Sequence, residues 1–554
     1  MQSRMPLGNF LVAYLRKIGV RHVFGIPGDL VIHLFMKFGQ SRGLDVITLS
    51  HEPSVGFAAD GYARSTGGLG VVCVTYGAGG FNVINPIAGA FAERVPLLVV
   101  SGGPGEDEYR LGTLIHHQAK AIESQVRMFR EVTCAARVIA DPRTAAEEID
   151  EVVRAIWLQR RPGYLEIHRD MVDRVVSVPR RLVAWDGRLP RPKSDPRKVA
   201  EAADEAAAWI NRSKRPMVIV GIEPYRFGAK KAVVSLVDRL GCACAASVLA
   251  KGAFPMEHPQ YMGVYAGPLS PAAIRRRVRD ADLILSLGTL LTDIELGQQS
   301  PEISREKSIW TIHNRVRIRF HNYNDVSERD FIQALLKRPL RRRAESVGYH
   351  DNLPSRVEDD GPPVKMAPLL KTLNAFLAEH PRMAVVVDSG DSLFGGIEIK
   401  VPSTGLYMAQ GFYASMGYSI PGALGAQIGT GLRPLILCGD GSFQMTGVEI
   451  AHAVRLGLNP IVVLLNNGGW GIFRPITRQK KLLDLPAWPY ARFAELWGGT
   501  GMRVSSVSEL RHALEVAAEE RRFVLIETMI DPQDLSPVSR RYIESAARRA
   551  RPAA

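Results

Sequence analysis

The segment from Gly439 to Asn467 carries the strongest chemical signal in the chain. It begins with a Gly-Asp-Gly-Ser turn and ends with two adjacent asparagines. The short apolar runs at 434–438 and 460–465 predict buried strands, and helical spacing of apolar residues lies between them. A strand–helix–strand unit of this length makes its two strands parallel neighbours. Asp440 and Asn467 therefore follow the carboxyl ends of adjacent strands, where open α/β sheets bind ligands.

The side chains in this segment are typical of a site for a hard cation. Asp440 offers a carboxylate and Asn467 an amide oxygen, and the glycine-rich turns offer backbone carbonyls. Mg²⁺ held by few protein ligands usually bridges to phosphate, which turn amides at a helix start also bind. In the alternative interpretation, Asp440 caps a helix and the asparagines form a turn. Either half alone fits that alternative, but their joint spacing favours the cation site.

A second set of polar residues lies in the first part of the chain. Glu52 stands between a predicted strand at 46–50 and a helix, where the helix dipole alone also favours a glutamate. Asp29 ends a "VFGIPGD" turn, and His116 and His117 lie in a predicted loop. Neither a helix nor a strand puts adjacent residues on one face, so we expect no metal site from the histidine pair alone.

Composition is typical of a soluble globular protein. The chain has 554 residues, of which 46% are hydrophobic and 23% charged. No apolar run approaches the roughly 20 residues that span a bilayer. The first 20 residues predict an amphipathic helix and lack the apolar core and cleavage site of a signal peptide. Five cysteines without metal-binding spacing favour buried thiols in a reducing, cytoplasmic setting.

The net charge of +14 is high and is compatible with a nucleic-acid partner. The basic residues nevertheless occur in short clusters, at 275–277, 341–343 and 548–549, and no long basic tract joins them. We interpret them as solvated surfaces and linkers. Such a field also favours small anionic substrates.

Two proline-rich and charged stretches, 178–196 and 337–365, predict linkers. They divide the chain into domains at 1–175, 190–340 and 366–540. Each domain alternates helical patterns with short apolar strands. The prediction is an α/β protein with three doubly wound parallel-sheet domains.

Motifs along essentially the whole chain resemble those of thiamine diphosphate enzymes. The motifs are "GIPGD", "LSHEPSVGFAADGYAR", "VTYGAGGFN", "HHQ", "DSGDSLF", "GDGSFQMTG" with its later "NN", and "LSPVSRRY". The chain is most similar to 2-oxo acid decarboxylases of the indolepyruvate/phenylpyruvate branch. Acetolactate-synthase-like relatives usually have Phe-Gln where "HHQ" stands here. The resemblance implies a thiamine-diphosphate-binding fold with pyrimidine-binding, central and diphosphate-binding domains.

The resemblance also implies ligands for the cofactor. Asp440, Asn467 and the Gly469 carbonyl are expected to hold Mg²⁺, which binds the cofactor diphosphate. Glu52 is expected to lie against N1′ of the aminopyrimidine, where its carboxylate favours the imino tautomer. The other expected cofactor contacts are Asp391, Ala414, Met416, Gly439, Gly441 and Ser442.

By the same resemblance, the reaction converts a 2-oxo acid to an aldehyde and CO₂, and Asp29, His116 and His117 manage the protons. Pyruvate decarboxylases carry a glutamate seven residues after the first asparagine of the pair, where this chain has Phe473. Tyr542 matches an aromatic position that approaches the substrate in the arylpyruvate branch. Both residues favour an aromatic or bulky substrate over pyruvate.

Partners and alternatives complete the expectation. In this family the cofactor spans two subunits, so we expect a homodimer or a dimer of dimers, with no nucleic-acid or membrane partner. One alternative is a carboligase or lyase of the acetolactate-synthase-like group. Another is a non-catalytic basic protein that binds nucleic acid or has a regulatory role. The intact set of Glu52, Asp440 and Asn467 disfavours this alternative.

Overall fold

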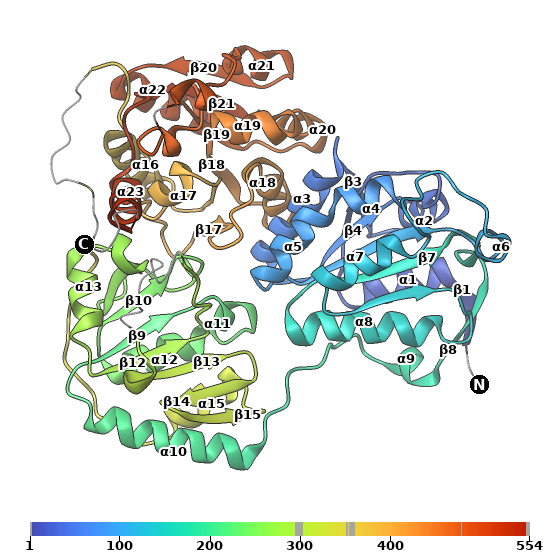
Figure 1. The fold of residues 1–554 in the computed structure, drawn as a ribbon, viewed down its shortest axis with the longest axis horizontal. Coiled ribbons are helices and arrows are strands. Elements are labelled where there is room, and N and C mark those ends of the chain that lie inside the picture. Colours follow the sequence, from blue (N-terminus) through green and yellow to red (C-terminus); the bar gives the residue numbers. More distant parts are fainter. Residues whose placement is uncertain (1–2, 294–302, 351–352, 354–360, 478, 550–554) are drawn as a thin grey trace. The chain divides into compact units, whose positions relative to one another are not determined.

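The computed structural model describes residues 3–293, 303–350, 353, 361–477 and 479–549 (Figure 1). Contacts group the chain into two compact units. The first comprises residues 1–191 together with 420–431 and 448–452, and the second comprises the rest. Part of the predicted linker at 337–365 lies outside the described residues. No helix in the described ranges has the length and apolar character needed to cross a membrane.

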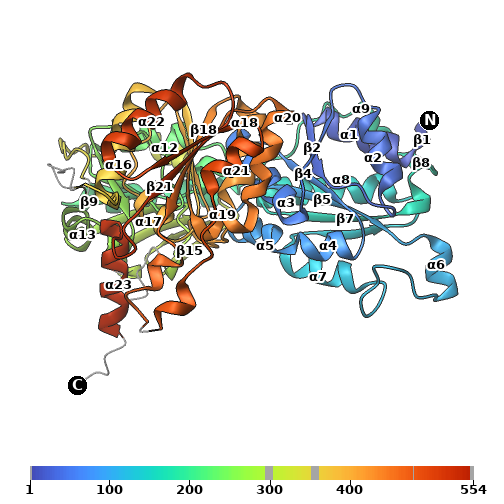
Figure 2. The same cartoon turned by 90° about the horizontal axis from the view of Figure 1, so that it is seen from above.

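The first unit is built on a six-stranded parallel sheet of order β3-β2-β4-β5-β7-β6. Helices cover both of its faces (Figure 2). Its strands are β2 (His22–Gly25), β3 (Asp45–Thr48), β4 (Gly70–Val74), β5 (Leu97–Gly103), β6 (Ala136–Ile139) and β7 (Gly163–His168). The helices on one face are α1 (Leu7–Lys17), α2 (Ile32–Gly39) and α8 (Ala145–Gln159). Other helices of this unit are α3 (Glu52–Thr66), α4 (Ala78–Asn82), α5 (Ile84–Ala92) and α7 (Ser124–Val132).

The observed N-terminal helix is shorter than the predicted one. Residues Ser3–Pro6 form strand β1, which pairs antiparallel with β8 (Val175–Val178). Helix α1 begins only at Leu7. Its apolar face, which includes Phe10, Leu11 and Tyr14, packs in the core of the first unit.

The second unit contains two sheets. The sheet of its middle segment has the order β11-β10-β9-β12-β13-β14-β15. The first five strands of that order are parallel, but β14 and β15 are antiparallel additions at one edge, so the prediction of a wholly parallel sheet is wrong there. The strands are β9 (Pro216–Val220), β10 (Cys244–Ser247), β11 (Tyr261–Tyr265), β12 (Leu283–Leu287), β13 (Ser308–Ile312), β14 (Arg315–Ile318) and β15 (His321–Asn324).

The last sheet is parallel throughout, in the order β17-β16-β18-β19-β21-β20. Its core packs against α16 (Met366–Glu379) and α22 (Val507–Glu519). The strands are β16 (Met383–Val387), β17 (Leu406–Ala409), β18 (Arg433–Gly439), β19 (Ile461–Asn466), β20 (Thr500–Val504) and β21 (Val524–Met529). Each of the three sheets therefore has a core of parallel strands. The predicted domain boundaries stay predictions.

The strand–helix–strand unit predicted at Gly439–Asn467 is confirmed. Strand β18 ends at Gly439, α19 (Asp440–Thr446) begins at the next residue, and β18 and β19 are parallel neighbours. The expected single helix is broken after Thr446 into a 3₁₀ turn and the short α20 (His452–Leu456). The buried Glu449 lies at the break and accepts a hydrogen bond from the Ser50 amide at 2.9 Å. That contact favours the break over a continuous helix.

Candidate functional site

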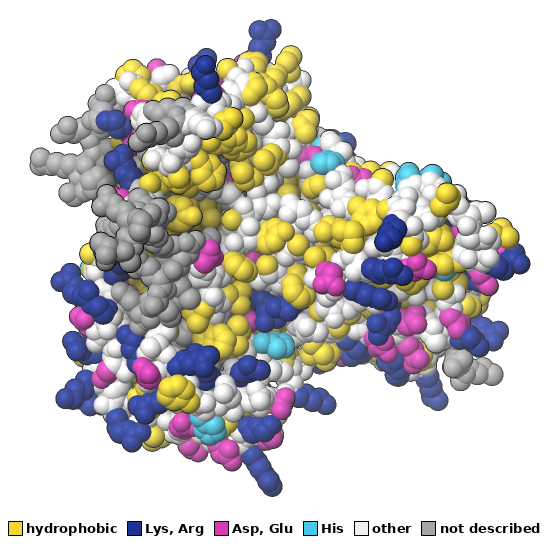
Figure 3. All heavy atoms as spheres, viewed as in Figure 1, with side chains coloured by type: hydrophobic (Ala, Val, Ile, Leu, Met, Phe, Trp, Pro, Cys, Tyr) yellow, Lys and Arg dark blue, Asp and Glu magenta, His cyan; other side chains and the backbone are white. Residues whose placement is uncertain are grey.

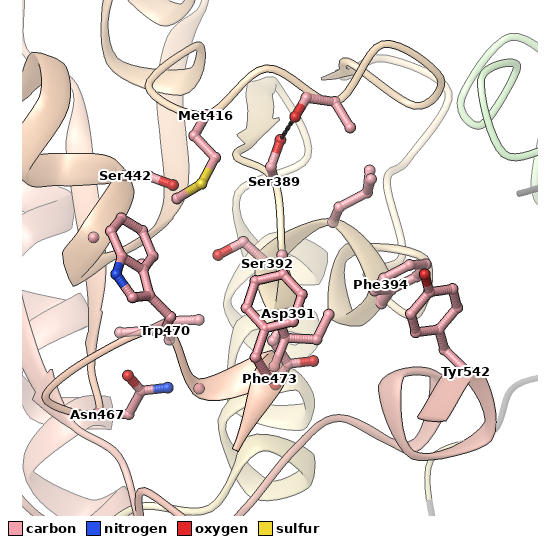
Figure 4. Close-up of a pocket in the computed structure, with 18 of the residues that line it drawn as sticks. Ser389, Asp391, Ser392, Phe394, Met416, Ser442, Asn467, Trp470, Phe473 and Tyr542 are labelled. Atoms are coloured by element: carbon pink, nitrogen blue, oxygen red, sulfur yellow. Dashed lines mark hydrogen bonds between the residues drawn. The ribbon is translucent and has the colours of Figure 1, made fainter. Parts of the chain in front are cut away.

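A cavity of about 360 Å³ lies in the second unit, where β16, β18 and β19 end (Figure 4). This volume is within the range of small-molecule sites. The predicted residues at its wall come from the segments after these strands, from the loop after β17, and from α23 (Pro537–Arg549). They are Asp391, Ala414, Met416, Gly439, Asp440, Gly441, Ser442, Asn467, Gly469, Phe473 and Tyr542.

Asp440 is the most constrained carboxylate of the cavity. Its side chain is buried, and its two oxygens accept hydrogen bonds from the amides of Gly441 at 2.7 Å and Gly469 at 3.0 Å. Burial raises the pKa of Asp440 to about 6, although these amides act in the opposite direction. Buried carboxylates are normally paired with a cation or bound to a metal. Its position and chemistry therefore fit a metal ligand.

The two adjacent asparagines have different roles. The side-chain amide of Asn466 donates a hydrogen bond to Glu527 Oε1 at 2.8 Å, so Asn466 links β19 to β21. Asn467 instead lines the cavity, and its Oδ1 lies 3.2 Å from the Gly469 amide nitrogen. A Cβ built on Gly471 would lie 2.2 Å from Asn467 Nδ2, so a side chain at 471 would displace the Asn467 amide group. Only the second asparagine is placed to reach a ligand in the cavity.

The polar groups of the cavity fit a Mg²⁺ ion bound to a diphosphate. Asp440, Asn467 and the Gly469 carbonyl are all oxygen donors, which Mg²⁺ prefers. Ser392 also lines the cavity, and its buried hydroxyl has no hydrogen-bond partner within the described part of the chain. A phosphate oxygen would satisfy that hydroxyl. Sequence reasoning missed Ser392, although it follows Asp391 directly.

The loop that carries Met416 is organised by Asp388, which follows β16. This buried carboxylate accepts from the amides of Gly417 at 3.1 Å and Ser419 at 2.8 Å. The Ser389 hydroxyl donates to the Ala414 carbonyl at 2.7 Å, and Met416 projects toward the cavity (Figure 4). Sequence reasoning identified Ala414 and Met416 but missed Asp388. The available signal was a carboxylate directly after a buried strand.

Asp391 lines the cavity, but its carboxylate is engaged by the C-terminal helix. It accepts hydrogen bonds from the Ser536 amide at 3.0 Å, from the Ser536 hydroxyl, and from the Ser539 hydroxyl at 2.6 Å. Burial raises the pKa of Asp391, although these bonds oppose the shift. Asp391 therefore joins α17 (Asp391–Gly396) to α23. Its predicted contact with the cofactor stays a prediction.

Aromatic side chains form one wall of the cavity (Figure 4). Tyr542, from α23, stacks on Phe394 with ring centroids 5.0 Å apart. Phe473 lines the cavity and is 52% exposed, so it is not a core residue. A charge introduced at Phe473 would therefore stay partly in contact with solvent, which limits its cost to stability.

In the first unit, Glu52 is the first residue of α3. Its Oε2 accepts a hydrogen bond from the Asn82 side-chain amide at 2.8 Å. Asn82 belongs to α4 and also lies 2.8 Å from His51 Nε2. Asn82, which sequence reasoning missed, thus fixes the Glu52 carboxylate.

The other three predicted catalytic residues meet in the same unit. Asp29 and His116 form a hydrogen bond through Nε2, and His117 Nδ1 donates to the Tyr76 carbonyl at 3.2 Å. One ligand atom from each of Asp29, His116 and His117 lies within 4.8 Å of the others. Burial alone would raise the pKa of Asp29, but the hydrogen bonds from His116 and the Leu30 amide, together with the nearby imidazoles, lower that pKa. The first unit thus brings together the three groups predicted to handle protons.

Three protein-family models match the chain, all of them describing thiamine pyrophosphate enzymes. The N-terminal thiamine-binding domain matches residues 5–128, the central domain 203–328 and the C-terminal thiamine-binding domain 388–528.

Curated relatives agree with these models over nearly the whole chain. An indole-3-pyruvate decarboxylase of Azospirillum brasilense is 36% identical over 549 residues, covering 98% of this chain and 99% of the relative. Pyruvate decarboxylase 2 of Arabidopsis thaliana is 31% identical over 557 residues, with 96% and 89% covered. A probable pyruvate decarboxylase of Schizosaccharomyces pombe is 29% identical over 547 residues, with 96% and 95% covered.

Proposed function

Since the chain belongs to the thiamine pyrophosphate enzyme family and is a 2-oxo acid decarboxylase, we propose that it acts on an aromatic or bulky 2-oxo acid of the indolepyruvate or phenylpyruvate type. Its reaction is the non-oxidative, thiamine diphosphate-dependent removal of CO₂, which makes it a carboxy-lyase. The observation that carries the proposal is the aromatic wall of Phe473 and Tyr542 in the cavity.

The second unit would hold the cofactor by its charged end. Asp440, Asn467 and the Gly469 carbonyl would bind Mg²⁺, and the Ser392 hydroxyl and the turn amides at Gly441 would bind the diphosphate. The other cavity residues assigned to the cofactor are Asp391, Ala414, Met416, Gly439 and Ser442. When bound, thiamine diphosphate supplies the thiazolium that accepts the electrons released as CO₂ leaves.

The first unit would supply the acids and bases. Glu52, held by Asn82, would share a proton with the pyrimidine nitrogen N1′. Asp29 and His116 already form a hydrogen bond, and His117 keeps Nε2 available because Nδ1 is engaged by the Tyr76 carbonyl. These three side chains would pass protons to the nascent aldehyde and help release it.

The aromatic wall gives a physical reason for substrate preference. Each buried methylene of a substrate contributes about 0.8 kcal/mol, so an aryl side chain gains a few kcal/mol over the methyl group of pyruvate. That gain corresponds to roughly a hundredfold in kcat/KM. The exposed half of Phe473 leaves ring surface available for such contacts.

A substrate panel tests the proposal. The values of kcat/KM for phenylpyruvate, indolepyruvate and pyruvate are measured by CO₂ release, with the aldehyde quantified beside it. We expect a preference of about a hundredfold for the aryl substrates, with one aldehyde for each CO₂. Phe473→Glu should reduce this preference. Phe320→Glu is the matched control, because Phe320 is also exposed but is absent from the cavity wall.

Equal kcat/KM values for pyruvate and phenylpyruvate would contradict the preference without affecting the decarboxylase assignment. CO₂ release with little aldehyde, and with longer hydroxyketone products, would instead favour the carboligase alternative.

We also propose a homodimer or a dimer of dimers. Glu52 belongs to the first compact unit and Asp440 to the second, and the family resemblance assigns them to different chains at one cofactor. A cytoplasmic location is supported by five unpaired cysteines.

A further inference from the structure

We propose that Asp29, His116 and His117 bind a transition-metal ion of the Zn²⁺ type, separate from the Mg²⁺ expected at Asp440, and that this ion inhibits the enzyme reversibly. The three side chains offer one carboxylate and two imidazoles, whose ligand atoms lie within 4.8 Å of one another. Imidazole suits zinc, nickel and copper, whereas Mg²⁺ prefers oxygen ligands alone. The two ion sites therefore differ in chemistry.

The spacing of the three groups is close to what a zinc ion needs. Zinc binds nitrogen and carboxylate oxygen at about 2.0–2.2 Å, which puts two tetrahedral ligands roughly 3.3 Å apart. The Asp29 and His116 side chains are 51% and 58% exposed, so small rotations can adjust them without disturbing a core. The separations, at most 4.8 Å, exceed this spacing by no more than about 1.5 Å.

His117 already has the hydrogen bond that metal-binding histidines use. Its Nδ1 donates to the Tyr76 carbonyl, because a carbonyl oxygen only accepts. This bond fixes the ring and leaves the Nε2 lone pair available, as in histidine ligands oriented by a backbone carbonyl. Tyr76 is itself buried, and its hydroxyl donates to the Ile122 carbonyl at 2.6 Å. The orienting group is therefore anchored in the unit.

The backbone at His117 is fixed in a conformation that few side chains adopt. Its φ of 68° lies in the left-handed region. The segment rests on Gly77, where a Cβ would come within 2.0 Å of the His117 carbonyl oxygen. Residues held in this way are over-determined by their surroundings. The second imidazole is thus placed by protein contacts before any ion arrives.

Inhibition follows from the use of the same lone pairs, and this step rests on the proposed function. A bound ion would replace the hydrogen bond between Asp29 and His116 and would occupy the free nitrogen of His117. Side chains coordinated to a metal cannot accept and return protons.

Binding is tested on the full-length protein loaded with thiamine diphosphate and excess Mg²⁺, with no substrate present. Calorimetry follows Zn²⁺, and the visible absorption of Co²⁺ reports imidazole coordination. We expect one saturable site per chain. Asp29→Asn, His116→Gln and His117→Gln should each weaken binding by about tenfold or more. Circular dichroism confirms that each variant is folded.

Two control variants make the assignment specific. His33→Gln should leave binding unchanged, because His33 is an exposed histidine 4.0 Å from Asp173 but outside the cluster. Asp440→Asn should also keep the Co²⁺ signal, which separates this site from the Mg²⁺ site. Full affinity in both Asp29→Asn and His116→Gln, or the absence of saturable Zn²⁺ binding, would overturn the site.

Inhibition is tested separately. Zn²⁺ should abolish CO₂ release over the same concentration range in which it binds, and a zinc-selective chelator should restore it while Mg²⁺ remains in excess. Saturated binding with unchanged turnover would refute the inhibition. Because binding is measured without substrate, a failure of the proposed substrate assignment leaves the binding result intact.

Discussion

At the residue scale, the proposed role of Asp440 as a Mg²⁺ ligand predicts a dependence of metal binding on pH. Burial raises the pKa of this carboxyl to about 6, and only the ionised form binds Mg²⁺ well. Below that pH the proton competes, so Mg²⁺ affinity should fall as the pH is lowered through about 6. Magnesium titrations of the unmodified protein on either side of this value measure the effect. Asp440→Asn should bind weakly at every pH, and a flat profile for the unmodified protein would contradict the role of Asp440.

Glu52 permits a second test with an almost isosteric change. In Glu52→Gln the side-chain oxygen can still accept from Asn82, so the fold should be retained. The loss of an acid–base group typically costs 10²–10⁴-fold in rate, and we expect kcat to fall by about that factor. Exchange of the C2 proton of bound cofactor, followed by NMR, should slow in parallel. Glu131→Gln, an exposed change on α7, is the control. Unchanged exchange in Glu52→Gln would leave Glu52 as a helix-start residue only.

The sequence predicted the residues whose spacing follows a strand–turn–helix pattern. Asp440 and Asn467 are confirmed to follow β18 and β19 directly. Sequence reasoning missed Asp388 and Asn82. The place of Asp388 after a buried strand was a local signal, but the hydrogen bonds through which both residues act reach segments 30 or 31 positions away. Asp388, for example, bonds the amide of Ser419, 31 positions away. The predicted roles of the site residues stay predictions until the substitutions are made.

At the scale of elements, helix α23 closes one side of the cavity and depends on Asp391 for its position. Ser539→Ala removes one hydroxyl donor to that carboxylate. A hydrogen bond to a charged group contributes about 1.5–3 kcal/mol. Without this bond, α23 should detach or unfold locally more often. Amide exchange in α23 should become faster, and kcat/KM for phenylpyruvate should fall because Tyr542 is held less firmly. Ser508→Ala, an exposed change on α22, should alter neither. Unchanged exchange in α23 would show that the bond is not needed.

Most elements were predictable because their apolar periodicity is local. Parallel strands such as β4 and β19 are mostly continuous apolar runs, and both are buried except at Asn466, the last residue of β19. The helix predicted after Asp440 was only partly correct. Its break coincides with a contact between Glu449 and Ser50, which are 399 residues apart in the chain. The antiparallel β14 and β15 were missed because they alternate exposed polar residues with few apolar ones.

At the scale of the whole molecule, the chain carries a net charge of +14. Lys and Arg side chains are interspersed with acidic and uncharged ones on the face shown in Figure 3. A nucleic-acid surface would gather them into one patch. The dispersed charge still favours anionic 2-oxo acids over neutral molecules.

The proposed oligomer is tested by complementation. Glu52→Gln and Asp440→Asn chains should each be inactive alone. If one cofactor is held by Glu52 of one chain and Asp440 of another, mixed dimers contain one intact site, and mixing should restore part of the turnover. Subunit exchange is monitored by mass spectrometry with one chain isotopically labelled. Exchange without recovery would mean that both residues of a site come from the same chain.

The central claim is that this chain is a decarboxylase that depends on thiamine diphosphate and Mg²⁺, and reconstitution tests it most directly. The cofactor and metal are removed with a chelator, and CO₂ release from phenylpyruvate is measured after adding back neither, either or both. We predict turnover only when both are present, and none in Asp440→Asn under the same conditions. Full turnover in protein shown to be free of thiamine diphosphate and divalent metal would contradict the account.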